Sequence, residues 1–544
     1  MLVPKAVTAM AMAMAMATDM AMIPSRSDLR GLRVPALRYL TQALLLLLAS
    51  EMAWGQSEER TAERRIFSIQ PLLSISGTAT DSLSTPQTGA KDRALIGVIS
   101  PGLSLRSYNG AFRGSLDYSM DGLVYLRTSQ RDRVQHHLTS QATVNLLDGR
   151  FLIDVRATLG QQARSAFSAE QSVSSNLGNA NQAQLANLMV APRLRGIVAS
   201  VASYEFSATA VESRVKNSII GDGRSGQVAA GFEGLGGAHR LINWNLSANA
   251  QRTSGNGQAR SVATDSVLAG IRLRPNPDLN LNLQAGKERS NYMTLNQVTA
   301  STYGLVLAWA PTERTTLNAD WRRHHYGNSH SLGFSHRMAR SSWRYADSQM
   351  VNSPGAVGAS GRLTNYALYD SIFTALEPDP VKRDLLVRTY LQNNGLNPDA
   401  LGNSGFLSGA ATMTRMQTGA ASLLGVRSTA TVTLSQGKTR RLDPFSSVVD
   451  DLSGGGLLLQ RSGAFTFSHR LSPASAVSLT VSEQRSSNVT TSQATDLKSL
   501  LASWNGRINP YLSYSANLRH ARFNSAQRSY QENAVTLTLT QQFQ

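Results

Sequence analysis

Residues 242–251 read INWNLSANAQ, and every second side chain in this stretch is apolar. If the stretch forms a β-strand, the apolar side chains lie on one face and the polar side chains lie on the other. The same alternation recurs from about residue 66 to the end of the chain, for example in residues 279–285 (LNLNLQA). The sequence therefore predicts an all-β protein, a large antiparallel sheet closed into a transmembrane β-barrel whose apolar face meets lipid.

The composition fits such a barrel and excludes a helical membrane protein. The chain has 544 residues, of which 41% are hydrophobic, and a mean hydropathy of −0.20. No apolar run reaches the roughly 18 residues that a transmembrane helix needs, whereas a barrel strand needs apolar side chains only at alternate positions. The absence of cysteine excludes disulfides and thiolate metal sites.

The first 55 residues are typical of a leader with a signal peptide. An apolar run at residues 40–49 follows four arginines and precedes Ala53-Trp54-Gly55, so we expect cleavage near Gly55. The run is too short to span a bilayer, which makes a signal anchor the weaker alternative. An Ala-Met repeat at residues 9–22 suggests that residues 1–25 stem from a start codon assigned too far upstream. Residues 56–544 would then form the barrel.

The connections between the expected strands are of two kinds. Tight connections carry proline, as at residues 274–278 and 471–474, because proline presets a turn and ends strand pairing. Other connections are long and polar, such as residues 164–183, 351–363 and 439–454. Short turns at one end and long external loops at the other are typical of the outer membrane of Gram-negative cells. We expect about 22 strands, within a range of about 18 to 24.

One short helical insertion interrupts the alternation, at residues 364–410. Its first part has an apolar stripe at helical spacing, and its second part begins at an Asp-Pro pair and is apolar on every side. Such a helix needs burial, so we expect a plug in the lumen or a lid over the mouth. A folded external loop that serves only stability is the alternative. The plug candidates are Leu368, Ile372, Phe373, Leu376, Asp379, Pro380, Leu385 and Tyr390.

Charged side chains that alternate with apolar neighbours are expected to face the lumen, because a charge in the hydrocarbon costs about 2–4 kcal/mol. They form either a ladder of cross-strand ion pairs or a lining that guides an anionic polysaccharide. The candidates are Arg106, Arg113, Arg156, Arg272, Arg322, Arg344, Arg519, Asp117, Asp154, Asp320 and Asp347.

The net charge of +18 is spread along the chain, which argues against nucleic acid as a partner. One interpretation is that the cations lie at the rim, beside outer-membrane lipid and lipopolysaccharide. The other is a cationic lumen for an anionic solute. Aromatic residues on the apolar positions predict a girdle at the two lipid–water boundaries. They include Trp244, Trp309, Trp321, Trp343 and Trp504.

Motifs for catalysis or metal binding are weak. Gly437-Lys438-Thr439 ends like a phosphate-binding loop, but Val432 stands where that loop requires a glycine. No G-x-S-x-G occurs, although a serine, a histidine and a polar partner on adjacent strands could still form a triad. The tandem pair His324-His325 would point to opposite faces of a strand, so it cannot chelate one metal. His324 could approach His330 across a hairpin, but no carboxylate spacing accompanies them, which favours ordinary histidines of the polar rim. We expect no enzyme activity, no metal and no cofactor.

Three stretches are distinctive, namely residues 146–157 (LLDGRFLIDVRA), 307–315 (LAWAPTERT) and 331–337 (SLGFSHR). With several shorter motifs, they resemble the PEP-CTERM system-associated outer-membrane proteins. The resemblance implies a barrel linked to exopolysaccharide and exosortase systems, without catalytic residues. The chain departs from the family at Ser82, and it ends on Phe543-Gln544 where recognition by the barrel assembly machinery usually finds a terminal aromatic residue. The motifs are residues 79–82 (ATDS), 99–105 (ISPGLSL), 116–118 (LDY), 137–138 (HL), 146–157 (LLDGRFLIDVRA), 307–315 (LAWAPTERT), 326–328 (YGN), 331–337 (SLGFSHR) and the Asp379-Pro380 helix segment.

Together these observations predict a passive, porin-like pore or a scaffold for the export or anchoring of surface polysaccharide or protein. In the pore, a positively biased lumen would be gated by residues 364–410. The alternative is a structural or adhesive surface barrel with a blocked lumen and no transport.

Overall fold

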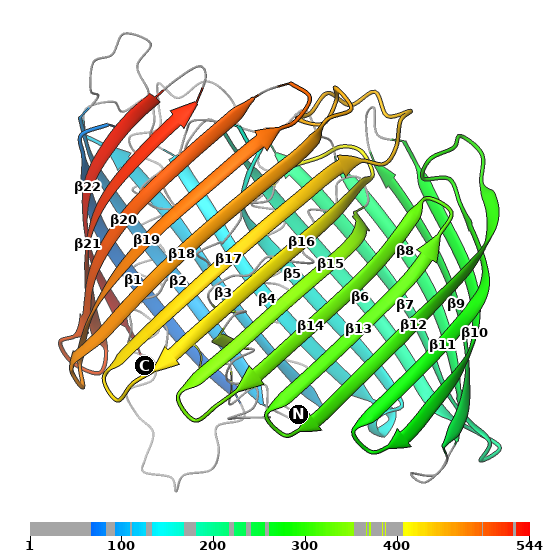
Figure 1. Ribbon diagram of the computed structural model, residues 1–544. Helices are drawn as coiled ribbons and strands as arrows, with labels where there is room; N and C mark the ends of the chain where they lie inside the picture. The colour runs from blue at the N-terminus through cyan, green and yellow to red at the C-terminus, as the bar shows by residue number, and fades with distance from the viewer. Residues whose placement is uncertain are drawn as a thin grey trace, which may run out of the picture.

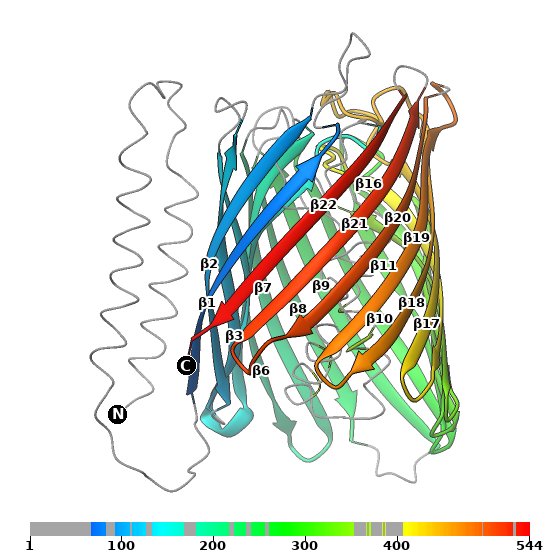
Figure 2. The same cartoon turned by 90° about the vertical axis from the view of Figure 1, so that its left-hand side faces the viewer.

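Twenty-two antiparallel strands form one closed wall in the computed structural model (Figure 1). Consecutive strands pair with one another, and the last strand pairs with the first, from Leu72 with Gln542 to Thr80 with Ala534. Figure 2 shows this seam, with β22 beside β1. The predicted closed barrel and the expected strand number are both confirmed.

The structure describes residues 67–82, 93–108, 111–126, 133–167, 181–216, 222–235, 241–255, 260–352, 406–491, 493–525 and 529–543, together with Tyr366, Tyr369, Asp370, Arg383 and Val387. The predicted leader and signal peptide lie outside these residues. Within the described residues, no helix is long and apolar enough to cross a membrane.

The strands are ten to seventeen residues long, as a tilted crossing of a bilayer requires. Their bounds are β1 Phe67–Thr80, β2 Ala94–Tyr108, β3 Phe112–Tyr125, β4 Arg133–Leu146, β5 Phe151–Ala163, β6 Gln182–Val198, β7 Ala202–Lys216, β8 Gly223–Gly234, β9 Ile242–Gly255, β10 Val262–Asn276, β11 Leu279–Ser290, β12 Val298–Thr312, β13 Thr315–His324, β14 Gly327–Arg337, β15 Ser341–Asn352, β16 Thr412–Leu424, β17 Ser428–Arg441, β18 Leu457–Ser472, β19 Ser475–Asn488, β20 Ala494–Arg507, β21 Leu512–Ser525 and β22 Ser529–Gln542; a short 3-10 helix, Leu147–Gly149, joins β4 to β5.

The two ends of the barrel differ as the sequence predicts. At the end where β1 begins and β22 ends, the connections are short turns, such as residues 277–278, 313–314 and 473–474. At the opposite end lie the long connections, including residues 353–411 between β15 and β16. By the rule for outer-membrane barrels, the first end is periplasmic and the second is extracellular.

The wall separates apolar from polar side chains by parity. In β9, Ile242, Trp244 and Leu246 are exposed, whereas the alternating Asn243 and Asn245 are partly buried. A closed wall crowds side chains that point inward and spreads those that point outward. The exposed apolar set is therefore the outer, lipid-facing surface, and the polar set lines the lumen.

The outer surface is itself asymmetric along the barrel axis. Trp244, Trp309, Trp343 and Trp504 are all exposed, and each lies within four residues of a periplasmic turn or strand end. They form an aromatic girdle at the periplasmic boundary of the bilayer. Toward the extracellular end the same face carries arginine and lysine.

Candidate functional site

The structure places ten of the eleven charged candidates on the lumen face, opposite in parity to the exposed apolar residues. Arg106, for example, is paired with Ser68 of β1, next to the exposed Ile69. The same parity places Arg272 between Asn243 and Asn282 on neighbouring strands. The ten are Arg106, Arg113, Arg156, Arg272, Arg322, Arg344, Arg519, Asp117, Asp154 and Asp320.

Asp347 is a correction, because it lies on the outer face. It has the parity of Trp343 and Tyr345 on β15, both of which are exposed. Its carboxylate is compensated there by Arg415 at 2.5 Å and by His330 at 3.1 Å. Because Asp347 has the same parity as Trp343 and Tyr345, the alternation itself places it on the outer face. The prediction was wrong because it grouped Asp347 with Arg344, which is three residues away and therefore on the opposite face.

Several lumen carboxylates are paired with arginine. Arg106 donates two hydrogen bonds to Asp117, both at 2.9 Å. Arg272 forms an ion pair with Glu233 across β8–β10, and Arg519 lies 3.8 Å from Glu532. These pairs match the expected ladder, in which cross-strand charges of opposite sign stabilise the wall.

Sequence reasoning missed the partner of Asp154, which is Arg193 of β6 at 2.6 Å. Arg193 follows Pro192 in a strand whose alternation is weak, and it lies opposite Leu152, diagonal to Asp154, which the sequence alone does not indicate. Arg113 and Arg156 are exposed to the lumen, and no carboxylate lies within ion-pair distance of either among the described residues. Because Asp117 and Asp154 are neutralised by Arg106 of β2 and Arg193 of β6, the lumen wall counted over β2–β6 keeps a positive excess.

A cavity of about 650 Å³ lies against the lumen wall near the periplasmic end of β6–β11. Its charged lining is balanced, with Arg150, Arg195 and Arg272 beside Asp148, Glu205 and Glu233. Arg195 is held by a hydrogen bond from its Nε to the carbonyl of Gly149, at 2.8 Å. This part of the lumen supports the ladder and not an anion-selective ring.

Described residues of the insertion contact the lumen wall far from its point of attachment. The hydroxyls of Tyr369 and Thr431 are 3.0 Å apart, and both side chains are buried. Thr431 lies on β17 four residues after the periplasmic turn at residues 425–427. The insertion enters at the extracellular end, so Tyr369 has crossed most of the length of the lumen.

Charged groups of the insertion are compensated at the same depth. Asp370 accepts a hydrogen bond from Arg383 at 2.8 Å, and its charge also interacts with Arg344 on the lumen face of β15. Val387 is fully buried. All eight plug candidates lie outside the described residues, and their burial stays a prediction. They are Leu368, Ile372, Phe373, Leu376, Asp379, Pro380, Leu385 and Tyr390.

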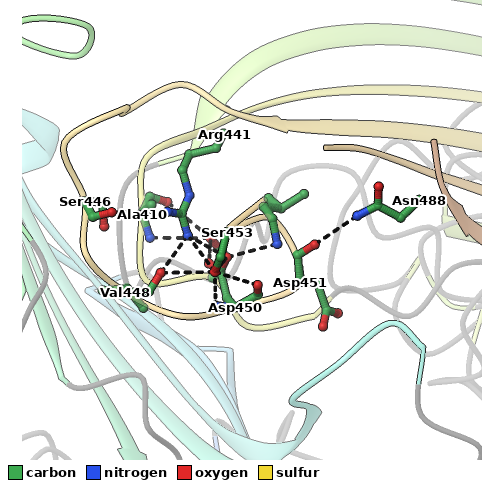
Figure 3. A network of polar contacts seen from close by, with 10 residues as sticks. Ala410, Arg441, Ser446, Val448, Asp450, Asp451, Ser453 and Asn488 are labelled. Atoms are coloured by element: carbon green, nitrogen blue, oxygen red, sulfur yellow. Dashed lines mark hydrogen bonds and ion pairs between the residues drawn. The ribbon is translucent and has the colours of Figure 1, made fainter. Parts of the chain in front are cut away.

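A network of buried charges lies at the extracellular mouth, in the β17–β18 connection (Figure 3). Arg441 forms an ion pair with Asp450 at 2.6 Å and donates to the carbonyl of Val448 at 2.8 Å. Asp450 also accepts from Ser408, at the end of the insertion, at 2.8 Å. The side chain of Asp450 is only 2% exposed, so its charge depends on these partners. We call residues 441–453 the latch.

The latch reaches across the mouth to the opposite wall. Asp451 accepts hydrogen bonds from the hydroxyl of Ser165 at 2.9 Å and the amide of Ala166 at 2.6 Å, just beyond β5. The amide of Leu407, just before β16, donates to the carbonyl of Ala163 at 3.1 Å. In a ring of 22 strands, β5 and β16 are diametrically opposed.

A further arginine holds the latch, and the carboxyl of Asp451 has a shifted pKa. Arg260, before β10, forms an ion pair with the buried Asp443 at 3.0 Å and donates to the carbonyl of Tyr292. Burial raises the pKa of the Asp451 carboxyl above its usual range, although its hydrogen bonds oppose that shift. The sequence predicts residues 439–454 only as a long polar connection, because nothing in them indicates which distant loops they contact.

A serine, a histidine and a carboxylate do meet on nearby strands of the wall. His324 of β13 contacts the Glu288 carboxylate of β11 through Nδ1, and its Nε2 lies 2.8 Å from the hydroxyl of Ser329 on β14. The ring of His324 also stacks on Tyr326, with ring centroids 4.7 Å apart. His330 lies on the other face of the wall, so His324 and His330 do not approach one another across the hairpin.

This chain of contacts has the order of a hydrolase triad, but Ser329 lies in a regular strand, paired with Arg322 in the β13–β14 ladder, and not at a sharp turn or helix N-terminus that presents converging N–H groups to an oxyanion. Among the described residues, no group of three metal-ligating side chains exists.

Comparison with known proteins adds the fold alone. No family model and no curated protein matches the sequence. Among solved structures, the chain is similar to the siderophore receptor PirA from Pseudomonas aeruginosa, with 10% identity and a TM-score of 0.43, over 89% of this chain and 81% of that one. It is also similar to the FrpB iron transporter from Neisseria meningitidis (F5-1 variant), with 10% identity and a TM-score of 0.45, over 87% and 82%. A loop L8 deletion mutant of OmpT from Vibrio cholerae is similar with 7% identity and a TM-score of 0.31, over 88% of this chain and 100% of that one.

The closed wall, the outward apolar band and the polar lumen define an outer-membrane β-barrel.

Proposed function

We propose that this barrel is a gated, passive pore that serves the export or anchoring of surface polysaccharide or surface protein in a PEP-CTERM and exopolysaccharide system. The observation that carries the pore is the contact of Tyr369 with Thr431, deep in the lumen. A segment that merely decorated the surface would have no contacts at that depth.

The proposal has two gates in series. The insertion occupies part of the lumen beside β15–β17, where Asp370 and Arg344 interact. The latch crosses the extracellular mouth through Asp451 and Ser165. Among the described residues, Tyr369 holds the insertion to the wall through a neutral hydrogen bond, worth about 0.5–1.5 kcal/mol. The latch is held by buried ion pairs as well, so a bound solute or partner would displace the insertion more readily than the latch.

The positive excess at Arg113 and Arg156 would give an open lumen a preference for anions. The resemblance to the PEP-CTERM-associated family suggests that the anion is an extracellular polysaccharide. No enzymatic step, metal or cofactor forms part of this proposal.

The test is conductance in planar bilayers. Wild-type protein should pass little current, and a variant that lacks residues 364–405 should pass a larger, anion-preferring current. That deletion keeps residues 406–411, which hold the mouth contact with Ala163. A thermal unfolding midpoint near that of wild type would show that the shortened chain is folded. No current from either protein would contradict the pore and favour the structural or adhesive barrel with a blocked lumen.

The proposed pathway needs a separate test. Loss of the gene in its native host should reduce exopolysaccharide at the cell surface, and reintroduced wild-type protein should restore it. Unchanged surface polysaccharide would contradict the pathway while leaving the pore intact.

A further inference from the structure

Two like-charged pairs lie directly opposite one another across strands on the outer face of β16–β19. Arg415 of β16 is in register with Lys438 of β17, and Arg461 of β18 is in register with Arg485 of β19. All four have the parity of the exposed, lipid-facing Leu434, Phe465 and Val481. They lie four or five residues from the extracellular ends of their strands, above the apolar band.

Like charges in register destabilise a sheet unless something neutralises them. The neighbouring carboxylates are mostly engaged elsewhere. Asp347 pairs with Arg415, while Glu483 and Asp496 lie 3.4 Å and 3.9 Å from Lys498. Asp496 is in register with Arg485 on its β20 side, so it offsets part of the charge of that arginine. Within the described strands, no carboxylate is within ion-pair distance of Lys438 or Arg461. This part of the outer face therefore has a positive excess without a protein partner.

A row of side-chain amides fixes the position of these cations. Arg461 donates from Nε to Gln436 at 3.0 Å, and Gln436 donates to Gln417 at 3.2 Å. Gln417 in turn donates to Asp347 at 3.0 Å. The network runs across four strands on the lipid-facing surface, where an arrangement of polar groups is costly unless a polar ligand meets it.

Directly below the cations, toward the bilayer centre, the same face is apolar. Phe465 and Phe467 of β18 are both exposed, and Val432 and Leu434 of β17 lie beside them. The surface is thus itself amphiphilic, with cations above and hydrocarbon below. A free anion would use only the upper part, whereas a lipid would use both.

We infer that this surface binds the phosphorylated headgroup of an anionic outer-leaflet glycolipid, with one phosphoryl group at each like-charged pair. The two pairs are separated by two strand spacings across the sheet and by two residues along it. From the usual strand spacing and rise per residue, the distance between them is roughly 12 Å. That distance suits two phosphoryl groups at the ends of a disaccharide. Arginine and lysine are the side chains that bind phosphate best, and each phosphoryl group removes the repulsion within its pair.

The experiment uses the full mature chain in a zwitterionic detergent and measures lipid binding by native mass spectrometry. The probes are bisphosphorylated lipid A, monophosphorylated lipid A and phosphatidylcholine. We expect lipid A to bind more tightly than its monophosphorylated form, and phosphatidylcholine not to compete. Replacement of Arg461→Ala with Arg485→Ala should weaken bisphosphorylated lipid A by about tenfold or more, given the usual effect of two cations at a membrane surface.

Two matched variants separate charge from damage to the fold. Arg461→Lys with Arg485→Lys keeps the charges and should retain most of the affinity. Lys287→Ala with Arg289→Ala removes two outer-face cations from β11, on another part of the wall, and should leave the affinity unchanged.

Three results would overturn the inference. The first is unchanged affinity in the Arg461→Ala and Arg485→Ala variant. The second is an equal loss in the β11 variant, which would indicate a general effect of net charge. The third is complete competition by inorganic pyrophosphate, which would indicate a site for a free anion and not for a lipid.

Discussion

The hydroxyls of Tyr369 and Thr431 lie 3.0 Å apart on the lumen side of the wall, although their residues belong to an extracellular insertion and to the periplasmic part of β17. Tyr369→Phe removes this contact without changing the size of the ring. A lost neutral hydrogen bond costs about 1 kcal/mol, so single-channel recordings should show open events about five times more often. Thr433→Val, at the next lumen position of β17, is the control, and an equal effect of both changes would contradict a specific contact.

The ion pair of Arg441 with Asp450 should dominate the stability of the latch. Arg441→Met leaves the Asp450 carboxylate buried without its cation, which costs about 3–5 kcal/mol. Cleavage of residues 442–456 by an added protease should therefore become much faster. Arg252→Met breaks an exposed outer-face pair with Asp265 and should cost less than about 1 kcal/mol. Similar protease resistance of the Arg441→Met variant and wild type would show that the latch is held by other contacts.

The contact of Asp451 with Ser165 and Ala166 should depend on pH. Because burial raises the pKa of Asp451 in the folded protein, the folded state binds its proton more tightly than the unfolded state does. The resulting stabilisation is complete below the ordinary pKa and is lost as pH rises through the folded pKa. Hydrogen exchange at the Ala166 amide, corrected for its intrinsic rate, should show weaker protection at about pH 7 than at about pH 4. Asp451→Asn should remove the difference, and an equal pH dependence in that variant would exclude Asp451 as its source.

The Ser329–His324–Glu288 chain is expected to be structural. A hydrolase needs converging donors for the oxyanion, and Ser329 lies in a regular strand paired with β13, where successive backbone N–H groups point to opposite sides. A fluorophosphonate probe should therefore leave Ser329 unmodified, and Ser329→Ala should cost only about 1 kcal/mol of stability. Mass spectrometry of the probe-treated protein decides the matter, because a stable adduct on Ser329 would identify a nucleophile and revive the enzyme alternative.

Arg113 and Arg156 should set the ion preference of the unplugged barrel. In the variant that lacks residues 364–405, Arg113→Ser with Arg156→Ser should shift the reversal potential in a salt gradient toward cations. Arg106→Ser with Asp117→Ser removes a neutral pair and should shift it much less. Equal reversal potentials in all three proteins would place the selectivity filter elsewhere.

The wall could be predicted from the sequence because the period of a strand is two and one face must meet lipid. Ile242, Trp244 and Leu246 show this directly, since each is exposed where the alternation places it. The strand number followed from the spacing of the turns. Asp347 shows the limit of the method, because a carboxylate near the membrane boundary can lie on the outer face when Arg415 compensates it.

The mouth could not be predicted in the same way. The contacts of Asp451 with Ser165 and of Arg260 with Asp443 join residues that are 286 and 183 positions apart. No local period relates such residues, and their loops have ordinary polar composition. The depth reached by Tyr369 was equally hidden, since helical spacing predicts a buried face but not the wall against which it packs.

The latch and the Leu407–Ala163 contact connect the extracellular ends of β5 and β16, which lie on opposite sides of the barrel. Any motion that moves the extracellular end of β5 away from that of β16 must stretch these contacts, and their release must let the two sides separate. Deformation of the rim and unlocking of the entrance are therefore one mechanical event, which a pull on the outer loops could trigger without any change at the periplasmic end.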